Sequence, residues 1–190
     1  YYDNFPGGFG KTTTVLYYLN NGTKHYSWIH VHPEMENFYT FIEYLVESLK
    51  TLNAGFGDST IEICKNYRQR YQFSKHYKTV VRDIAGTIVN EFLVCFPEKV
   101  AIVFDDLDRA SSPLWIKLFF DEFFSNQPQN LQIFTTSRQN PAIDTSLLAA
   151  KRDILKINEE QLKFTIHETE ELLKDIYSIK SSGEKAAELQ

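Results

Sequence analysis

Short apolar runs rich in β-branched and aromatic residues alternate along this chain with longer stretches of helical periodicity. The runs cover residues 28–31, 100–104, 131–135 and, more weakly, 154–157. Between them, apolar residues recur every three or four positions, at Phe38, Phe41, Ile42, Leu45, Leu49 and Leu52, and at Val81, Ile84, Ile88 and Phe92. This alternation predicts an α/β fold with a parallel sheet flanked by helices.

Two local signals mark the starts of further helices. Ser112 and Pro113 suit the N-cap and first position of a helix that carries Leu114, Leu118, Phe119 and Phe123. Thr165 and Glu168 have the spacing of a capping box, in which each side chain bonds the backbone N–H of the other residue. We therefore expect a last helix to begin at Thr165.

Composition limits the class of protein. The 190 residues are 43% hydrophobic, enough for a packed core, and no run is long and uncharged enough to span a membrane. The net charge of −5 disfavours a surface dedicated to duplex nucleic acid. Cys64 and Cys95 form no CxxC pair, which favours a reducing compartment. We expect one main domain in a cytoplasmic protein. We also expect the chain to be a fragment of a longer protein.

A glycine-rich segment near the start of the chain has the composition of a phosphate loop. Gly7, Gly8, Phe9 and Gly10 precede Lys11, Thr12 and Thr13, and a helix-compatible run follows. Backbone N–H groups of such a loop and the helix N-terminus together bind phosphate. We expect Lys11 to bridge the β- and γ-phosphates of ATP and Thr12 to place its hydroxyl on Mg²⁺.

One position departs from the GxxxxGK[ST] pattern. Phe5 stands where the pattern has a small residue, at the sharp exit from the first strand. Residues 1–4 also make a poor strand, so either the fragment begins inside that strand or the loop is altered. A glycine turn before an ordinary helix is the alternative interpretation of this segment.

Two carboxylates follow a fully apolar run about ninety residues later. Asp105 and Asp106 come directly after Phe104, at the end of the predicted strand. In a phosphate-loop fold this strand end faces the nucleotide, so Asp105 would hold the Mg²⁺ shell and Asp106 would orient or deprotonate the attacking water. A strand that ends in an acidic turn is the alternative.

The strand predicted at residues 131–135 also ends in polar residues. Thr136 or Ser137 could bond the γ-phosphate or the attacking water, and Arg138 could sense the charge of the γ-phosphate. The alternative is a polar turn with a solvated arginine.

With these segments in place, the chain resembles the signal-transduction ATPases with numerous domains (STAND), and specifically the MalT-like ATP-binding modules of large LuxR-type transcriptional regulators. The segments that carry the resemblance are PGGFGKTT (6–13), residues 27–49, VAIVFDDLD (100–108), LQIFTTSRQNP (131–141) and residues 154–173. In family terms, the first is the Walker A loop, the third the Walker B strand and the fourth the sensor strand.

The resemblance implies an additional-strand, AAA-like P-loop NTPase fold in which the sensor strand lies between the phosphate-loop strand and the Walker B strand. It implies a P-loop core over residues 1–157 and a closing helical segment over 158–190. It also implies slow ATP hydrolysis and self-association in the ATP state, with ADP as the product. Inducer and DNA would be bound only by regions that are absent from this chain.

The sequence is compatible with other functions, and several residue groups have more than one interpretation. A nucleotide-binding scaffold without hydrolysis and a small-molecule phosphoryltransferase are the alternatives to an ATPase. Residues 63–82 carry six basic residues and no acidic one, which suits a solvated helix pair or an anionic partner. His30, His32 and Glu34 lack the further ligands that zinc requires. Arg109 is either a finger acting on a neighbouring subunit or, more simply, a surface partner of Asp106 or Asp108.

Overall fold

The three strands of the computed structural model form one parallel sheet in the order β1-β2-β3. The structure describes residues 10–22, 25–110, 114–139, 143–151, 153–168 and 171. β1 (Tyr26–His30) and β3 (Leu131–Thr135) flank β2 (Val100–Asp105). The register pairs His30 with Asp105 and Phe104 with Thr135, so all three strands end at the same edge. All six residues of β2 are buried, because helices cover both faces of the sheet.

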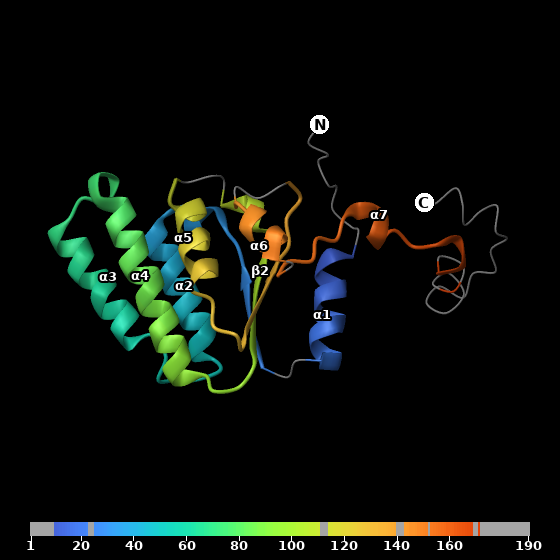
Figure 1. Cartoon of the computed structure of the whole chain (residues 1–190), viewed down its shortest axis with the longest axis horizontal. Helices are drawn as coiled ribbons and strands as arrows, with labels where there is room; N and C mark the ends of the chain where they lie inside the picture. The colour runs from blue at the N-terminus through green and yellow to red at the C-terminus, as the bar shows by residue number, and fades with distance from the viewer. Residues whose placement is uncertain are drawn as a thin grey trace.

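A helical layer covers one face of this sheet, as Figure 1 shows. The helices on this side are α2 (Phe38–Lys50), α3 (Asp58–Arg70), α4 (Phe73–Cys95) and α5 (Leu114–Ser125), and α3 is the outermost, packed on α4 and α2. The apolar stripes of α2, α4 and α5 are buried together with Val100, Ile102 and Phe104 of β2 in the main core. The periodic residues of the sequence are the ones buried here, which confirms the helices predicted around residues 38–52 and 81–92.

α1 (Lys11–Gly22) covers the opposite face of the sheet. Its Leu19 is fully buried with Ala101 and Val103 of β2, and Val15 packs beside them. α1 has an apolar stripe on one side only, so this smaller cluster is enough to seat it. The helix runs antiparallel to the strands (Figure 1). Its first residues therefore lie at the carboxyl edge of the sheet.

Short elements complete the described fold. η1 (Pro33–Glu36) joins β1 to α2, and the Asn37 side chain caps α2 by accepting hydrogen bonds from the backbone N–H groups of Tyr39 and Thr40. The remaining elements are η2 (Leu107–Arg109), α6 (Ser146–Lys151) and α7 (Glu159–Leu162). None of the helices in the described part of the chain is long and apolar enough to cross a bilayer.

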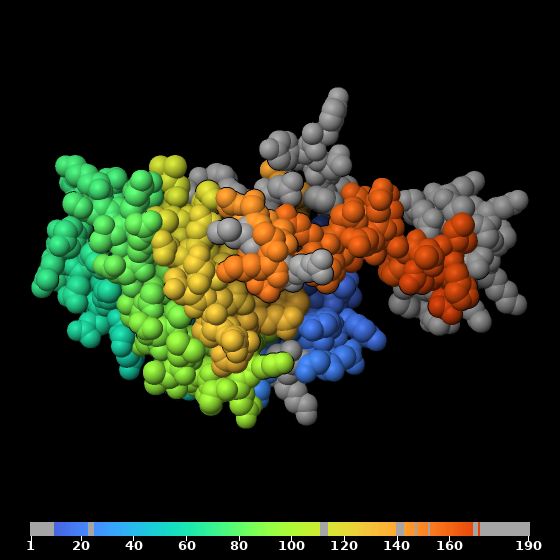
Figure 2. All heavy atoms as spheres, viewed as in Figure 1, coloured from blue at the N-terminus to red at the C-terminus, as the bar shows by residue number. Residues whose placement is uncertain are grey.

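The strand predicted at residues 154–157 is wrong. Residues 153–158 carry no strand in the structure, and Leu155 and Ile157 are 81% and 52% exposed. A short, mostly apolar run becomes a strand only where a neighbouring strand can accept its backbone hydrogen bonds. This segment runs over the surface instead, as the orange atoms of Figure 2 show.

The two predicted helix starts have different outcomes. The capping box is confirmed, because Glu168 accepts a 2.7 Å bond from the Thr165 N–H while the Thr165 hydroxyl accepts one from the Glu168 N–H. Ser112 and Pro113 lie outside the described residues. The helix that follows them is α5, but Leu114 is 80% exposed and the buried face consists of Trp115, Ile116, Phe119, Phe120 and Phe123.

Candidate functional site

The start of α1 and the end of β2 meet at the carboxyl edge of the sheet. The Thr12 hydroxyl donates a 3.1 Å hydrogen bond to Oδ1 of Asp105, across 93 residues of sequence. The sequence assigned both residues to a single magnesium site from two separate motifs. Their contact places these two residues side by side at this edge of the sheet.

Asp105 is 6% exposed, and its carboxylate has contacts from three elements. Besides Thr12, the Thr136 hydroxyl donates to Oδ1 at 2.5 Å from the end of β3. Nδ1 of His30, at the end of β1, lies 3.5 Å from Oδ2. A buried carboxylate without partners would be costly, and these contacts hold it in one orientation.

Asp106 begins the turn that leaves β2 and is surrounded by arginines. Its Oδ2 lies 3.0 Å from Nε of Arg109 and 3.9 Å from a terminal guanidinium nitrogen of Arg138. The simpler interpretation of Arg109, as a surface partner of a neighbouring carboxylate, is therefore confirmed. Both guanidinium groups are more than two-fifths exposed, so each pair contributes little to stability, and the arginines remain able to move toward a ligand.

The segment after β3 is held against the turn after β2. The backbone N–H of Arg138 donates to Oδ1 of Asp108 at 3.0 Å, and the Ser137 hydroxyl donates to the same oxygen at 3.2 Å. The carbonyl of Gln139 is a second, alternative acceptor for the single hydrogen of this hydroxyl. Thr136 and Ser137, which the sequence offered as partners for phosphate or water, thus both have partners within the protein.

Of the glycine-rich segment predicted to form the phosphate loop, the structure describes Gly10 and the residues that follow it. Gly7, Gly8 and Phe9 lie outside the described residues. Gly10 has φ +69°, a left-handed conformation that glycine adopts without steric cost, and its carbonyl accepts the first helical bond from Thr14 at 2.8 Å. Lys11 and Thr13 lie in the first turn of α1, at the same edge as Asp105. The structure therefore brings Lys11, Thr12, Asp105, Asp106 and Arg138 to one edge of the sheet.

The donor atoms at this edge fit a magnesium ion held together with a nucleotide. Mg²⁺ prefers hard oxygen ligands and commonly takes one or two from the protein, with phosphate oxygens and waters supplying the others. The Thr12 hydroxyl and the Asp105 carboxylate are such ligands. Within the described residues, no group of three or more His, Cys, Asp or Glu side chains forms a metal cage of its own.

Two contacts of this site were missed by sequence reasoning. His30 was considered only as a zinc ligand, although the sheet register places it opposite Asp105. Thr136 was considered only as a partner for the γ-phosphate or the attacking water. The pairing of β1 and β3 with β2 creates both contacts, and no short-range sequence pattern carries that register.

Features that the sequence left open have ordinary structural roles here. The basic stretch forms the α3–α4 helix pair, where Arg68 pairs with Glu43 at 2.8 Å and Arg82 with Glu122 at 2.7 Å. Cys64 and Cys95 are both free. Burial raises the pKa of the Cys64 thiol to about 12, so this thiol is a poor nucleophile at neutral pH.

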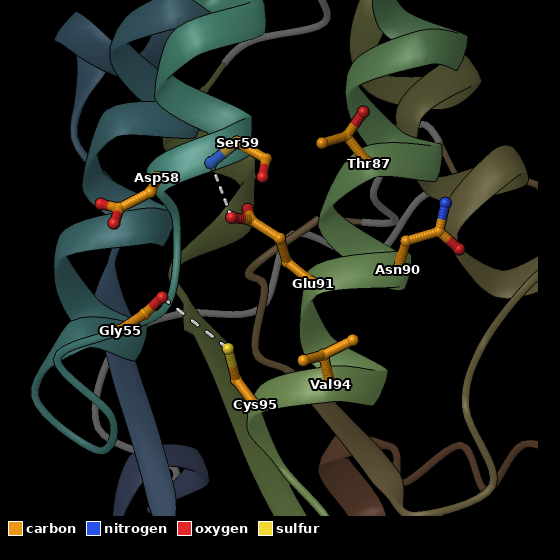
Figure 3. Close-up of a pocket in the computed structure, with 8 residues that line it drawn as sticks. All are labelled: Gly55, Asp58, Ser59, Thr87, Asn90, Glu91, Val94 and Cys95. Carbon is orange, nitrogen blue, oxygen red and sulfur yellow. Dashed lines mark hydrogen bonds between the residues drawn. The ribbon is translucent and has the colours of Figure 1, made fainter.

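A pocket of about 480 Å³ lies elsewhere in the molecule, between the start of α3 and the end of α4. Figure 3 shows Ser59 and Glu91 bonded across it, with Cys95 and Gly55 at one end. α4 ends four residues before β2 begins, so the pocket is near the amino edge of the sheet. It is separate from the carboxyl edge that holds Asp105.

The parallel sheet with helices on both faces and the Thr12–Asp105 contact define an α/β protein of P-loop NTPase-like architecture. No protein-family model matches the chain. It is similar to the HTH-type transcriptional regulator MalT of Cronobacter sakazakii, with 24% identity over 163 residues, and to MalT of Vibrio parahaemolyticus, with 24% over 164. MalT of Vibrio campbellii is 25% identical over 167 residues. Each match covers 86% of this chain and 17% of the relative, so the chain spans only a small part of these regulators.

Proposed function

We propose that this chain is an ATP-binding and slowly hydrolysing switch module of a signal-responsive, STAND-type transcriptional regulator. The observation that carries the proposal is the 3.1 Å contact between the Thr12 hydroxyl and Asp105, because it joins the lysine-bearing helix start to the acidic strand end. The similarity to MalT over 86% of the chain supports the regulatory setting. In the ATP state we expect the module to self-associate, and DNA and inducer would be bound by other parts of such a regulator.

In this proposal each residue has a distinct task. Lys11 binds the β- and γ-phosphates, and the N–H groups at the start of α1 bind phosphate oxygens. Bound Mg²⁺ would neutralise the charge that develops on the phosphates, held by Thr12 and Asp105. Asp106 orients the attacking water and accepts its proton.

Nucleotide binding would change which arginine pairs with Asp106, because Arg138 can contact either Asp106 or the γ-phosphate. Its guanidinium is exposed and only loosely paired with Asp106, at 3.9 Å, so a γ-phosphate can attract it. Asp106 would then keep Arg109 as its partner at 3.0 Å.

The test is to measure ATP and ADP affinity and ATP turnover for the full chain and two variants. We expect Asp106→Asn to retain ATP binding and to lose turnover by about 100-fold, because a general base is removed. We expect Lys11→Ala to weaken ATP binding by at least about tenfold, since a charge-assisted phosphate contact is lost. Lys65→Ala, on exposed α3, is the control for loss of one positive charge and should change neither property.

The outcomes separate the alternatives. Parent protein that binds ATP without turnover would indicate a scaffold, and turnover accelerated by an added small-molecule acceptor would indicate a phosphoryltransferase. Parent protein that binds neither nucleotide would contradict the proposal altogether.

A further inference from the structure

Thr136, the first residue after β3, has all of its polar groups bonded to the end of β2 and the turn that follows. It is 5% exposed. Its hydroxyl donates to Oδ1 of Asp105 at 2.5 Å and accepts from the backbone N–H of Asp106 at 2.9 Å. Its own N–H donates to the Phe104 carbonyl, and its carbonyl accepts from the Leu107 N–H, both at 2.9 Å. The residue that follows β3 thus bonds four consecutive residues, 104–107, of the neighbouring segment.

The backbone of Asp106 needs such a restraint. Its φ of 55° and ψ of 47° are left-handed, and among the described residues it is the only one with positive φ that is not glycine. A side-chain-bearing residue in this region is strained and persists only where the surroundings hold it. The bond from the Asp106 N–H to the Thr136 hydroxyl is a specific restraint of this kind.

The two hydroxyls on Oδ1 of Asp105 are not equivalent. The Thr12 bond is longer, at 3.1 Å, and Thr12 is exposed, so its hydroxyl is free to turn toward a metal ion. The Thr136 bond is 2.5 Å and buried, so it remains when Thr12 turns away. A hydroxyl has one hydrogen, and that of Thr136 is already used, which leaves none to donate to a γ-phosphate.

We propose that Thr136 is a positioning residue that fixes the carboxylate of Asp105 and the left-handed backbone of Asp106 through one hydroxyl. Arg138 lies two residues further along the same segment. A ligand that displaces Arg138 would therefore shift Thr136 and, through its hydroxyl, the positions of Asp105 and Asp106. The geometric part of the inference stands on the protein alone, whereas its consequence for turnover rests on the proposed ATPase function.

The geometric part is tested by amide hydrogen exchange of the full chain without nucleotide. Thr136→Val keeps the shape of the side chain and removes the hydroxyl. We expect the Asp106 amide to exchange at least about tenfold faster, because its acceptor is lost. The Leu107 amide is an internal control, since it bonds the Thr136 carbonyl, which the substitution leaves in place.

Two further variants complete the exchange test. Thr136→Ser retains the hydroxyl and should restore slow exchange at Asp106. Thr135→Val, at the exposed neighbouring position of β3, should leave Asp106 unchanged. If Thr136→Val does not fold, Thr136→Ala makes the same prediction with a smaller side chain. Unchanged Asp106 exchange in the hydroxyl-free variant, or equal acceleration in Thr136→Ser, would overturn the inference.

The functional consequence is measured by turnover with Mg²⁺ and ATP. We expect Thr136→Val to lower kcat by about tenfold or more, as for other residues that orient metal ligands, with a smaller change in KM, and Thr136→Ser to restore it. If the parent turns over ATP and Thr136→Val does so equally well, the inference is overturned. A parent without turnover contradicts the proposed function, while the exchange result still decides the positioning role.

Discussion

Gly57 shows how one backbone conformation can depend on a distant helix. It precedes α3 with φ +97°, and a Cβ built on it would lie 2.2 Å from Cγ1 of Val46 on α2. We expect Gly57→Ala to lower the free energy of unfolding by about 2–4 kcal/mol, because it combines a left-handed alanine with overpacking. Urea unfolding followed by circular dichroism measures this change.

Gly86 provides the matched control at the same scale. It lies inside α4, and a Cβ built there meets nothing within 4 Å. Gly86→Ala should raise the free energy of unfolding by about 0.5–1 kcal/mol, because alanine loses less entropy than glycine in a helix. Equal effects of the two substitutions would show that neither backbone conformation nor contact with Val46 matters.

At the scale of elements, α3 is capped by a side chain of α4. Its N-cap residue is Gly57, which has no side chain. Glu91 of α4 instead accepts from the N–H of Ser59 at 2.7 Å (Figure 3) and from the N–H of Thr60 at 3.1 Å. The buried Thr60 hydroxyl also donates to Glu91, at 2.5 Å. One carboxylate therefore joins the two helices at the amino end of α3 and satisfies donors that would otherwise be unpaired.

We expect Glu91→Ala to destabilise the protein by about 1–2 kcal/mol, since a helix cap and a buried hydroxyl both lose their acceptor. Asn90→Ala, at the exposed adjacent position of α4, is the control and should change stability by less than about 0.5 kcal/mol. Chemical denaturation midpoints of the two variants give the comparison. A loss no larger for Glu91→Ala than for Asn90→Ala would rule out this capping role.

Sequence reasoning succeeded for elements whose signal is local. The three strands at residues 28–31, 100–104 and 131–135, the periodic helices and the Thr165–Glu168 capping box were all predicted and are confirmed. It failed for residues 154–157, because an apolar run of this length resembles a strand whether or not a neighbouring strand exists. It also could not foresee Glu91, since a cap supplied from 31 residues away leaves no local pattern.

At the scale of the whole molecule, Phe41 of α2 joins the helical layer to the sheet. Its ring stacks on that of Phe104 of β2, with ring centroids 5.8 Å apart. The centroids of Trp115 and Phe119 of α5 lie 5.1 and 5.3 Å from that of Phe41. It is fully buried. The packing of this ring therefore sets how the helical layer sits on the central strand that ends in Asp105.

We expect Phe41→Ala to cost about 3–5 kcal/mol and Phe41→Leu less, because the larger truncation leaves a larger cavity among rings that cannot close it. Tyr44→Ala, on the exposed side of α2, should cost under about 1 kcal/mol. Thermal unfolding of the three variants measures the order of their stability losses. Equal costs for Phe41→Ala and Tyr44→Ala would contradict the assignment of Phe41 to the core.

The amino-acid sequence by itself determined the class of fold and the residue types at the candidate site. Period and composition act locally, so a lysine at a helix start and acids at a strand end could be recognised without coordinates. Only the tertiary structure decided that Thr12 contacts Asp105, that His30 and Thr136 complete its surroundings, and that Asp106 is left-handed between two arginines. These contacts depend on strand register and helix placement, which many weak packing interactions fix together across the whole chain.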